Sequence, residues 1–282
     1  MCTVTIELSQ RFTIDGVELA WDSWGSGGPA LFLCHGFSGS AHDFALQIEG
    51  LAETRRVISV DHRGHGRSTS TGSAAAYSID RLAADLAGLL DAVADGPVDL
   101  LGHSMGGQIA LRVTLARPDL VRSLVLMDTS AWSFVPADAD LAAMLQSFFE
   151  TYDPATGLPD MSALAGPEDE LIEQATPEAW RQRKEELSAA FDPFALKSLG
   201  EELFNPERVT VRSRLAEITR PVTVIVGSND HPLTGQAPEL AAELGAAPPV
   251  VIDGAYHSPQ LTHADAWRRA LEAHLERAGG AS

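Results

Sequence analysis

The sequence predicts an α/β protein built on a mainly parallel, doubly wound sheet with a helical cap insertion. Short, fully apolar runs recur along the chain, as expected for strands covered on both faces. Helical stretches separate these runs, which is the element order of a parallel sheet. The alternation is interrupted once, between about residues 131 and 215, where helical patterns occur without a strong strand signal.

The amino-terminal part predicts an antiparallel edge that leads into the parallel core. Residues 3–8 alternate in polarity, and Asp15-Gly16 is a hairpin signal before residues 17–21, so we expect two antiparallel edge strands. Buried strands are predicted after them at 30–34, 57–60, 98–101, 124–127, 222–226 and 250–252. Helices outside the interruption are predicted at 41–51, 78–93, 108–117, 239–244 and 264–276.

The interruption divides the chain into two predicted parts. Residues 1–130 and 216–282 are expected to form the core, and residues 131–215 the helical cap. Apolar residues at helical spacing predict three cap helices, around 141–149, 180–187 and 194–204.

Composition limits the classes of function. The 282 residues include 20 Lys and Arg against 39 Asp and Glu, and this net charge of −19 disfavours nucleic acid and anionic membranes as partners. Two cysteines are too few for a disulfide framework, and Cys34 is expected to be buried. Neither a secretory leader nor a membrane-span pattern is present, so a cytoplasmic location is expected. The expected partner is a small-molecule substrate, and the oligomeric state stays open.

The most informative segment is VDLLGHSMGG at residues 98–107. An apolar run ends in a turn with Ser104 at its apex, and a helix-compatible stretch follows. Gly102 and Gly106 let a strand and a helix approach closely on either side of the serine. The helix start leaves unpaired backbone N–H groups beside it, ready for a developing oxyanion. The segment therefore predicts a nucleophilic serine.

A serine hydroxyl needs a base, and the base needs an orienting acid. His257 follows the last predicted strand, and Asp230 follows the strand before it. Ligands in open α/β sheets bind outside the carboxyl ends of the strands, so both side chains are expected to converge on Ser104. Asp128, which ends the strand at 124–127, is the alternative acid. We favour Asp230 because it stands at the usual distance before the histidine.

The chain order serine, aspartate, histidine resembles the α/β-hydrolase superfamily, in its serine-nucleophile, capped branch of esterases and lactonases. The cap carries no matching motif, although in this family the cap largely sets the substrate. The resemblance implies that the backbone N–H groups of Phe37 and Met105 form the oxyanion hole. It rests on an HGF oxyanion-type loop at 35–37, a D-x-R-G-x-G-x-S turn at 61–68, the elbow at 102–106, and loops at 227–230 and 254–257.

The predicted function is hydrolysis of a carboxylic ester or lactone of a small to medium, mostly apolar substrate through an acyl-enzyme. A serine nucleophile argues against the dehalogenase and epoxide-hydrolase branches, which use a carboxylate at the elbow. The alternatives are a carbon–carbon bond hydrolase, a thioesterase, a cofactor-free perhydrolase, and a hydrolase-fold ligand receptor with slow turnover. No cofactor and no metal are expected, because the histidines lack metal-ligand spacing.

Two further sets of residues complete the prediction. Trp132, Met144 and Phe148 of the cap are expected to line the substrate pocket. Asp61 and Arg63 are expected to pair and to brace the loops behind the elbow.

Overall fold

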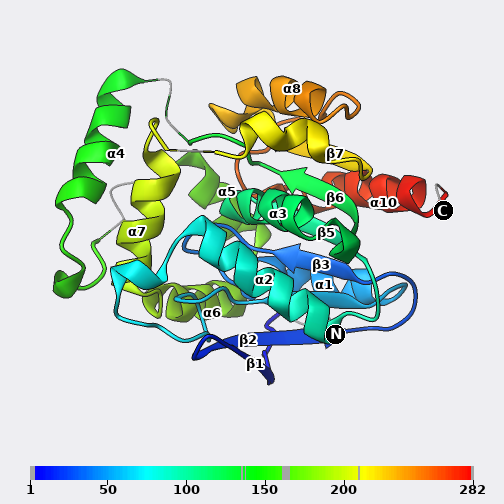
Figure 1. Ribbon diagram of the computed structural model, residues 1–282, viewed down its shortest axis with the longest axis horizontal. Coiled ribbons are helices and arrows are strands. Elements are labelled where there is room, and N and C mark those ends of the chain that lie inside the picture. The colour runs from blue at the N-terminus through cyan, green and yellow to red at the C-terminus, as the bar shows by residue number, and fades with distance from the viewer. Residues whose placement is uncertain (1–3, 135, 137, 161–165, 209, 281–282) are drawn as a thin grey trace.

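The computed structural model describes residues 4–134, 136, 138–160, 166–208 and 210–280. Its centre is an eight-stranded sheet in the order β1-β2-β4-β3-β5-β6-β7-β8 (Figure 1). The six strands from β3 to β8 are parallel, which confirms the predicted fold class. The strands are β1 (Gln10–Ile14), β2 (Val17–Trp24), β3 (Leu31–Cys34), β4 (Val57–Val60), β5 (Val98–His103), β6 (Val121–Met127), β7 (Val222–Gly227) and β8 (Val250–Ile252).

The antiparallel edge begins later than the sequence predicted. β1 pairs with β2 along its whole length, so the prediction of a strand at 3–8 was wrong. Asp15 and Gly16 form the two-residue turn, with φ of 48° and 77°, and such a turn joins only directly adjacent segments. The alternation at 3–8 has another cause, because Ile6 and Leu8 are buried in the core without forming a strand.

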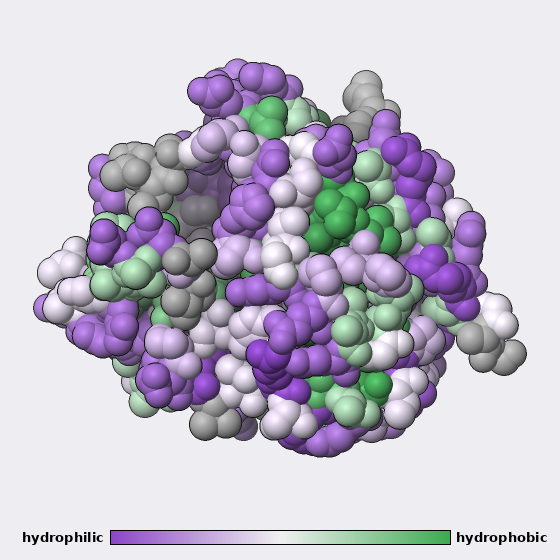
Figure 2. Space-filling view, turned by 90° about the horizontal axis from the view of Figure 1, so that it is seen from above, coloured by the Kyte–Doolittle hydropathy of each residue, from purple (hydrophilic) through white to green (hydrophobic). Residues whose placement is uncertain are grey.

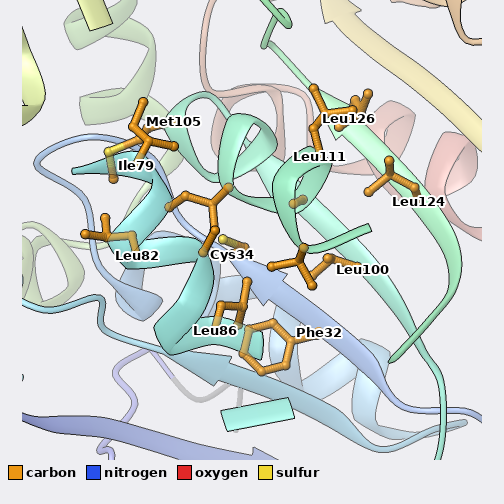
Figure 3. Packing of buried hydrophobic residues seen from close by; sticks show 14 of the residues in the cluster. Phe32, Cys34, Ile79, Leu82, Leu86, Leu100, Met105, Leu111, Leu124 and Leu126 are labelled. Atoms are coloured by element: carbon orange, nitrogen blue, oxygen red, sulfur yellow. The ribbon is translucent and has the colours of Figure 1, made fainter. Parts of the chain in front are cut away.

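Helices cover both faces of the sheet. α2, α3 and α8 pack on one face, and α1 and α10 pack on the other (Figure 1). On the first face, Phe32 and Cys34 of β3 pack with Leu86 of α2, and Cys34 is fully buried, as expected (Figure 3). The helices are α1 (Ala45–Ala52), α2 (Ile79–Val93), α3 (Met105–Ala116), α4 (Ala139–Thr151), α5 (Pro167–Ala175), α6 (Glu178–Ala189), α7 (Pro193–Phe204), α8 (Leu233–Glu243), α9 (Pro259–Thr262) and α10 (Ala264–Gly280).

Two core helices begin earlier than predicted. α3 begins at Met105, directly after the serine, and its first turn contains Gly106 and Gly107, which are poor helix formers. α8 begins at Leu233 and contains Pro238, a residue that normally interrupts a helix. In both cases the first turn carries residues of low helix propensity, so sequence patterns place the start too late.

The turn after β4 is braced by different ion pairs from the predicted one. Asp61 is fully buried and pairs with Arg67 at 3.0 Å. Arg63 points instead toward α2, where both its Nε and Nη2 bond the carboxylate of Asp85. Gly66 has a φ of 51° and turns the chain back over Asp61 so closely that a Cβ would overlap that carboxylate. This return brings Arg67 onto Asp61, so the predicted pairing with Arg63 was wrong.

The segment between β6 and β7 is helical over most of the residues that the structure describes there. Its helices α4 and α7 lie beside the carboxyl end of the sheet (Figure 1). α4 packs on α7, and the ring of Phe149 stacks on that of Phe204 with centroids 5.4 Å apart. The helical segment is tied to the core by a hydrogen bond from Tyr77 Oη to Asp192 Oδ2 at 2.5 Å and by the ion pair of Lys184 with Asp43.

The surface combines polar regions with smaller apolar ones. The face seen in Figure 2 is mostly hydrophilic, with separate apolar patches between the polar residues. Over the described ranges, the helices lack the combination of length and apolar character that crossing a membrane requires.

Candidate active site

Ser104 lies between the end of β5 and the start of α3. Its backbone has φ of 54° and ψ of −122°, a conformation that costs a non-glycine residue about 1–3 kcal/mol. The neighbouring glycines are required by close packing. A Cβ on Gly102 would overlap the Gly106 carbonyl oxygen, and one on Gly106 would overlap that of Cys34. The turn therefore holds the serine in a strained position above the strand ends.

His257 and Asp230 meet at the same edge of the sheet. Asp230 follows β7, His257 follows β8, and His257 Nδ1 lies 2.8 Å from Asp230 Oδ2. Asn229 joins the two loops, since its backbone N–H bonds Ala255 O at 2.8 Å and its side chain bonds Gly254 O at 3.2 Å. The imidazole is thus oriented by a carboxylate, while 36% of the His257 side chain stays exposed.

The pair has the electrostatics of a base and its acid. Burial by itself lowers the pKa of His257, but the charge and hydrogen bond of Asp230, together with the charge of Glu168, outweigh burial and raise it. For Asp230, burial acts to raise the pKa, but the charge of His257 and the hydrogen bonds outweigh burial and lower it. At neutral pH the aspartate is therefore ionised and can stabilise an imidazolium.

The start of α3 and the loop after β3 both approach Ser104. Met105 is the first residue of α3, so its N–H has no partner within the helix. Phe37 follows β3 in the loop that approaches the elbow most closely. A Cβ on Gly36 would lie 3.0 Å from Ser104 Cβ, so only glycine lets this loop come so near. The loop after β3 and the start of α3 therefore meet at Ser104.

One cavity of about 260 Å³ contains both Ser104 and His257. Its wall on the core side includes Phe37, Asp43, His103 and Leu261. On the other side the lining comes from α5 and α6, with Asp169, Ile172, Trp180 and Lys184.

The three predicted pocket residues do not line this cavity. Met144 is 52% exposed on α4. The ring of Trp132 lies under the guanidinium of Arg212, with the guanidinium carbon 4.4 Å from the centroid of the ring. Phe148 packs against Phe149 and Tyr152. The sequence showed the apolar face of α4, but this face packs on α7 and not over the serine. The i, i+4 spacing of Trp180 and Lys184 places both on one face of α6, and this spacing is the sequence feature that could have indicated them as lining residues.

Asp128, the alternative acid, lies behind Asp230 and does not hydrogen-bond His257. Its side chain is fully buried, and Oδ1 accepts the N–H of Gly227 at 2.8 Å. Burial and then the negative charge of Asp230 raise the pKa of Asp128 well above its usual range.

Glu168 is a nearby residue that sequence analysis missed. It lies in the first turn of α5, and its Oε1 accepts the backbone N–H of Ser258 at 2.5 Å. Burial raises the pKa of Glu168, opposed by the charge of His257. Acidic residues are common in the first turn of a helix, where they stabilise the helix dipole. The sequence therefore gave no reason to choose Glu168 over Asp169 or Glu170.

The other buried histidines that the sequence offered do not bond the carboxylate of Asp230. His103 Nε2 lies 2.8 Å from the backbone oxygen of His257, and burial lowers the pKa of His103 to about 3. Burial also lowers the pKa of His62 to about 3 and that of His65 to about 4. Within the described part of the chain, no group of three or more His, Cys, Asp or Glu side chains could hold a metal ion.

Comparison with known proteins agrees with this geometry. The chain is 33% identical over 164 residues to the sn-1-specific diacylglycerol lipase ABHD11 of Danio rerio, covering 56% of this chain and 50% of that protein. It spans half or less of the length of the first curated relatives that it matches.

Solved structures match over nearly the whole chain. A hydrolase from Pseudomonas aeruginosa PA01 has a TM-score of 0.73 and 25% identity, covering 94% of this chain and 97% of that one. The enol-lactonase from Burkholderia xenovorans LB400 has a TM-score of 0.74 and 22% identity, covering 95% and 100%, and shows likeness of fold. The family model of the alpha/beta hydrolase fold matches residues 29–264. With its parallel sheet and elbow, the chain belongs to the α/β-hydrolase fold family.

Proposed function

We propose that the protein is a serine hydrolase that cleaves a carboxylic ester or a lactone of a small to medium, mostly apolar substrate. The observation that carries this proposal is one cavity lined by Ser104 and His257, with Asp230 bonded to the far nitrogen of the imidazole. A nucleophile, a base and an orienting acid are the three side chains that acyl transfer requires.

In the first half-reaction, Ser104 Oγ attacks the carbonyl carbon and His257 Nε2 takes the hydroxyl proton. The carbonyl oxygen becomes an oxyanion, which the N–H groups of Phe37 and Met105 stabilise. When the tetrahedral intermediate collapses, His257 gives its proton to the leaving alkoxide. An acyl-enzyme on Ser104 remains.

In the second half-reaction, water attacks the acyl carbon while His257 takes one of its protons. Collapse of the second intermediate releases the carboxylic acid and returns the proton to Ser104 Oγ. For a lactone, the leaving hydroxyl belongs to the same molecule, so the single product is a hydroxy acid. Asp230 accepts the hydrogen bond from His257 Nδ1 throughout and offsets the imidazolium charge.

The cavity favours compact substrates. Its volume of about 260 Å³ lies below the 300–1,000 Å³ typical of ligand pockets. Phe37, Ile172, Trp180 and Leu261 give it apolar walls. Two of the similar proteins, a diacylglycerol lipase and an enol-lactonase, support an ester or lactone bond.

In this proposal the chain divides as its sequence suggests. Residues 1–130 and 216–282 form the catalytic core, and residues 131–215 form the cap. The cap contributes Ile172, Trp180 and Lys184 to the cavity.

The test compares wild type with Ser104→Ala on p-nitrophenyl acetate and on a five-membered lactone. Ser104→Ala is expected to lose turnover while keeping the circular dichroism spectrum, and a fluorophosphonate should label Ser104 alone. Ser70→Ala, at an exposed serine, is the matched control and should behave as wild type. A ligand receptor of this fold would give a stoichiometric burst without turnover, which contradicts the proposal. Labelling away from Ser104 would also contradict it.

A further inference from the structure

Two carboxyl groups lie next to each other behind the imidazole of His257. The carboxyl of Asp128 is close enough to that of Asp230 for the negative charge of Asp230 to raise its pKa. Asp128 Oδ1 already accepts the N–H of Gly227 at 2.8 Å. Asp128 Oδ2 is also buried, and no N–H or O–H donor of the described residues reaches it. The Oδ2 atom is therefore buried beside another carboxyl with no donor to satisfy it.

Two ionised carboxylates in this position would repel each other strongly. A hydrogen bond between two carboxyl groups needs one proton, because a carboxylate has only acceptors. Aspartic proteases use such a shared proton where two carboxyls lie close together. An ionised Asp128 would hold a fully buried oxygen without a donor next to the charge of Asp230, so protonation of one of the two carboxyls is favoured.

The surroundings decide which carboxyl holds the proton. Asp230 accepts the hydrogen bond of His257 Nδ1, and 11% of its side chain is exposed, both of which favour its ionised form. Asp128 is fully buried and receives one backbone N–H. We propose that Asp128 is a protonated carboxylic acid whose O–H donates to the carboxylate of Asp230, which makes Asp128 a positioning residue for the catalytic acid. This inference rests on the proposed function, in which Asp230 is that acid.

The fold delivers Asp128 to this place. It ends β6 with φ of 46°, and its N–H donates to Ile225 O of the neighbouring β7 at 2.9 Å. Its side chain is thereby directed to Gly227, where the loop that carries Asp230 begins. The aspartate therefore fixes the start of the acid loop through Oδ1 and the acid itself through its O–H.

The pKa directions agree with this assignment. Burial and the charge of Asp230 raise the pKa of Asp128 well above its usual range. The other titratable groups that face this cluster are His257 from the loop after β8, His103 from β5 and Glu168 from α5. Because His103 is held neutral, the His257 imidazolium is the cation that compensates Asp230 among the groups of the described residues that act on it.

The test uses two substitutions that separate shape from charge. Asparagine matches the protonated acid, since its Nδ2–H can donate to Asp230 while Oδ1 accepts Gly227 N–H. Alanine removes both bonds. We expect Asp128→Ala to lower kcat on p-nitrophenyl acetate roughly 10- to 100-fold, the range for losing a hydrogen bond to a charged group. Asp128→Asn should recover most of that loss.

The pH profile gives a readout that a purely structural role does not move. Without the O–H of Asp128, less of the negative charge of Asp230 is neutralised. The carboxylate then stabilises the imidazolium more strongly and raises the pKa of His257 further. The acid limb of kcat/KM should therefore shift to higher pH in Asp128→Ala. In Asp128→Asn it should coincide with that of wild type. A shift to lower pH in Asp128→Asn would mean that a negative charge had been removed, and would overturn the proposal.

An infrared measurement tests the proton directly and does not depend on activity. The difference spectrum between wild type and Asp128→Asn at neutral pH should contain the C=O stretch of a protonated carboxylic acid. Absence of this band overturns the proposal even if Asp128→Ala fails to fold. If wild type showed no Ser104-dependent activity, the proposed function would be refuted. The infrared result would still show whether Asp128 carries the proton.

Discussion

The indole of Trp180 stacks on the imidazole of His42, and each side chain hydrogen-bonds the backbone carbonyl of the other residue. The ring centroids are 5.3 Å apart, and both hydrogen bonds measure 3.1 Å. Asp43, the neighbour of His42, pairs with Lys184, one helical turn after Trp180. This contact fixes α6 to the segment after β3, so the same side chains set the position of α6 and the shape of the cavity.

Replacing Trp180 with phenylalanine should destabilise the protein. The variant keeps an aromatic ring but leaves the buried carbonyl of His42 without its indole donor, which costs about 1–3 kcal/mol. Urea unfolding measures this loss. Trp132→Phe is the matched control, because Trp132 is only partly buried, and it should stay within about 0.5 kcal/mol of wild type. Equal stability of Trp180→Phe and wild type would show that the hydrogen bond from the Trp180 indole to His42 O does not stabilise the packing of α6 on the core.

Asp230→Asn should lower kcat by about 10⁴, as the corresponding change did in a serine protease, because the amide favours the wrong tautomer of His257. The comparison with Asp128→Asn, at the plateau of each pH profile, decides between the two acids. Only Asp230 bonds His257 Nδ1, so its substitution should be far more damaging. The opposite ranking would move the catalytic acid to the end of β6.

The pH dependence of kcat/KM should show an acid limb above pH 6.5. His257 acts as a base only when neutral, and the charge of Asp230 raises its pKa above the ordinary value of 6.5 despite burial. Activity is therefore full at higher pH and falls as the pH drops through the raised pKa of His257. A rate profile with its acid midpoint below 6.5 would be inconsistent with the pairing of His257 and Asp230.

Glu168→Gln should move that acid limb toward lower pH by less than about one unit. The amide oxygen still accepts the N–H of Ser258, but the negative charge that helps to raise the pKa of His257 is gone. Glu170→Gln removes the same charge from an exposed position of α5 and is the control. If both variants shift the acid limb of kcat/KM equally, Glu168 affects the pKa of His257 only as one of the acidic residues of α5 and not through its own position.

Ile172→Ala should change the preference among acyl chains, whereas Met144→Ala should not. Ile172 lines the cavity and Met144 is exposed on α4. Shrinking an apolar pocket residue alters discrimination by about 10- to 200-fold. Ratios of kcat/KM for p-nitrophenyl acetate, butyrate and hexanoate measure the effect. A change confined to Met144→Ala would place the substrate against α4 instead.

Most of the fold could be predicted from sequence because its signals are local. The strand at 57–60 and the strand at 250–252 have the predicted bounds, since short apolar runs between polar turns define their own ends. The elbow was equally visible, because its strand, glycine-flanked serine and helix follow one another within residues 98–116, and the contact that requires Gly102 is with Gly106. Where a residue of low helix propensity lay inside an element, as Pro238 does in α8, the predicted start was late.

The sequence alone thus determined the fold class, the nucleophilic turn and the candidates for base and acid, because each depends on neighbours along the chain. Tertiary structure decided which partners these residues have. Arg67 and not Arg63 reaches Asp61, and α5 and α6 enclose the cavity while the apolar face of α4 packs on α7. The hydrogen bond from Gly227 N–H to Asp128 Oδ1 likewise joins residues 99 positions apart. Such contacts depend on how whole strands and helices pack, and side-chain packing over long sequence separations leaves no periodic pattern in the chain.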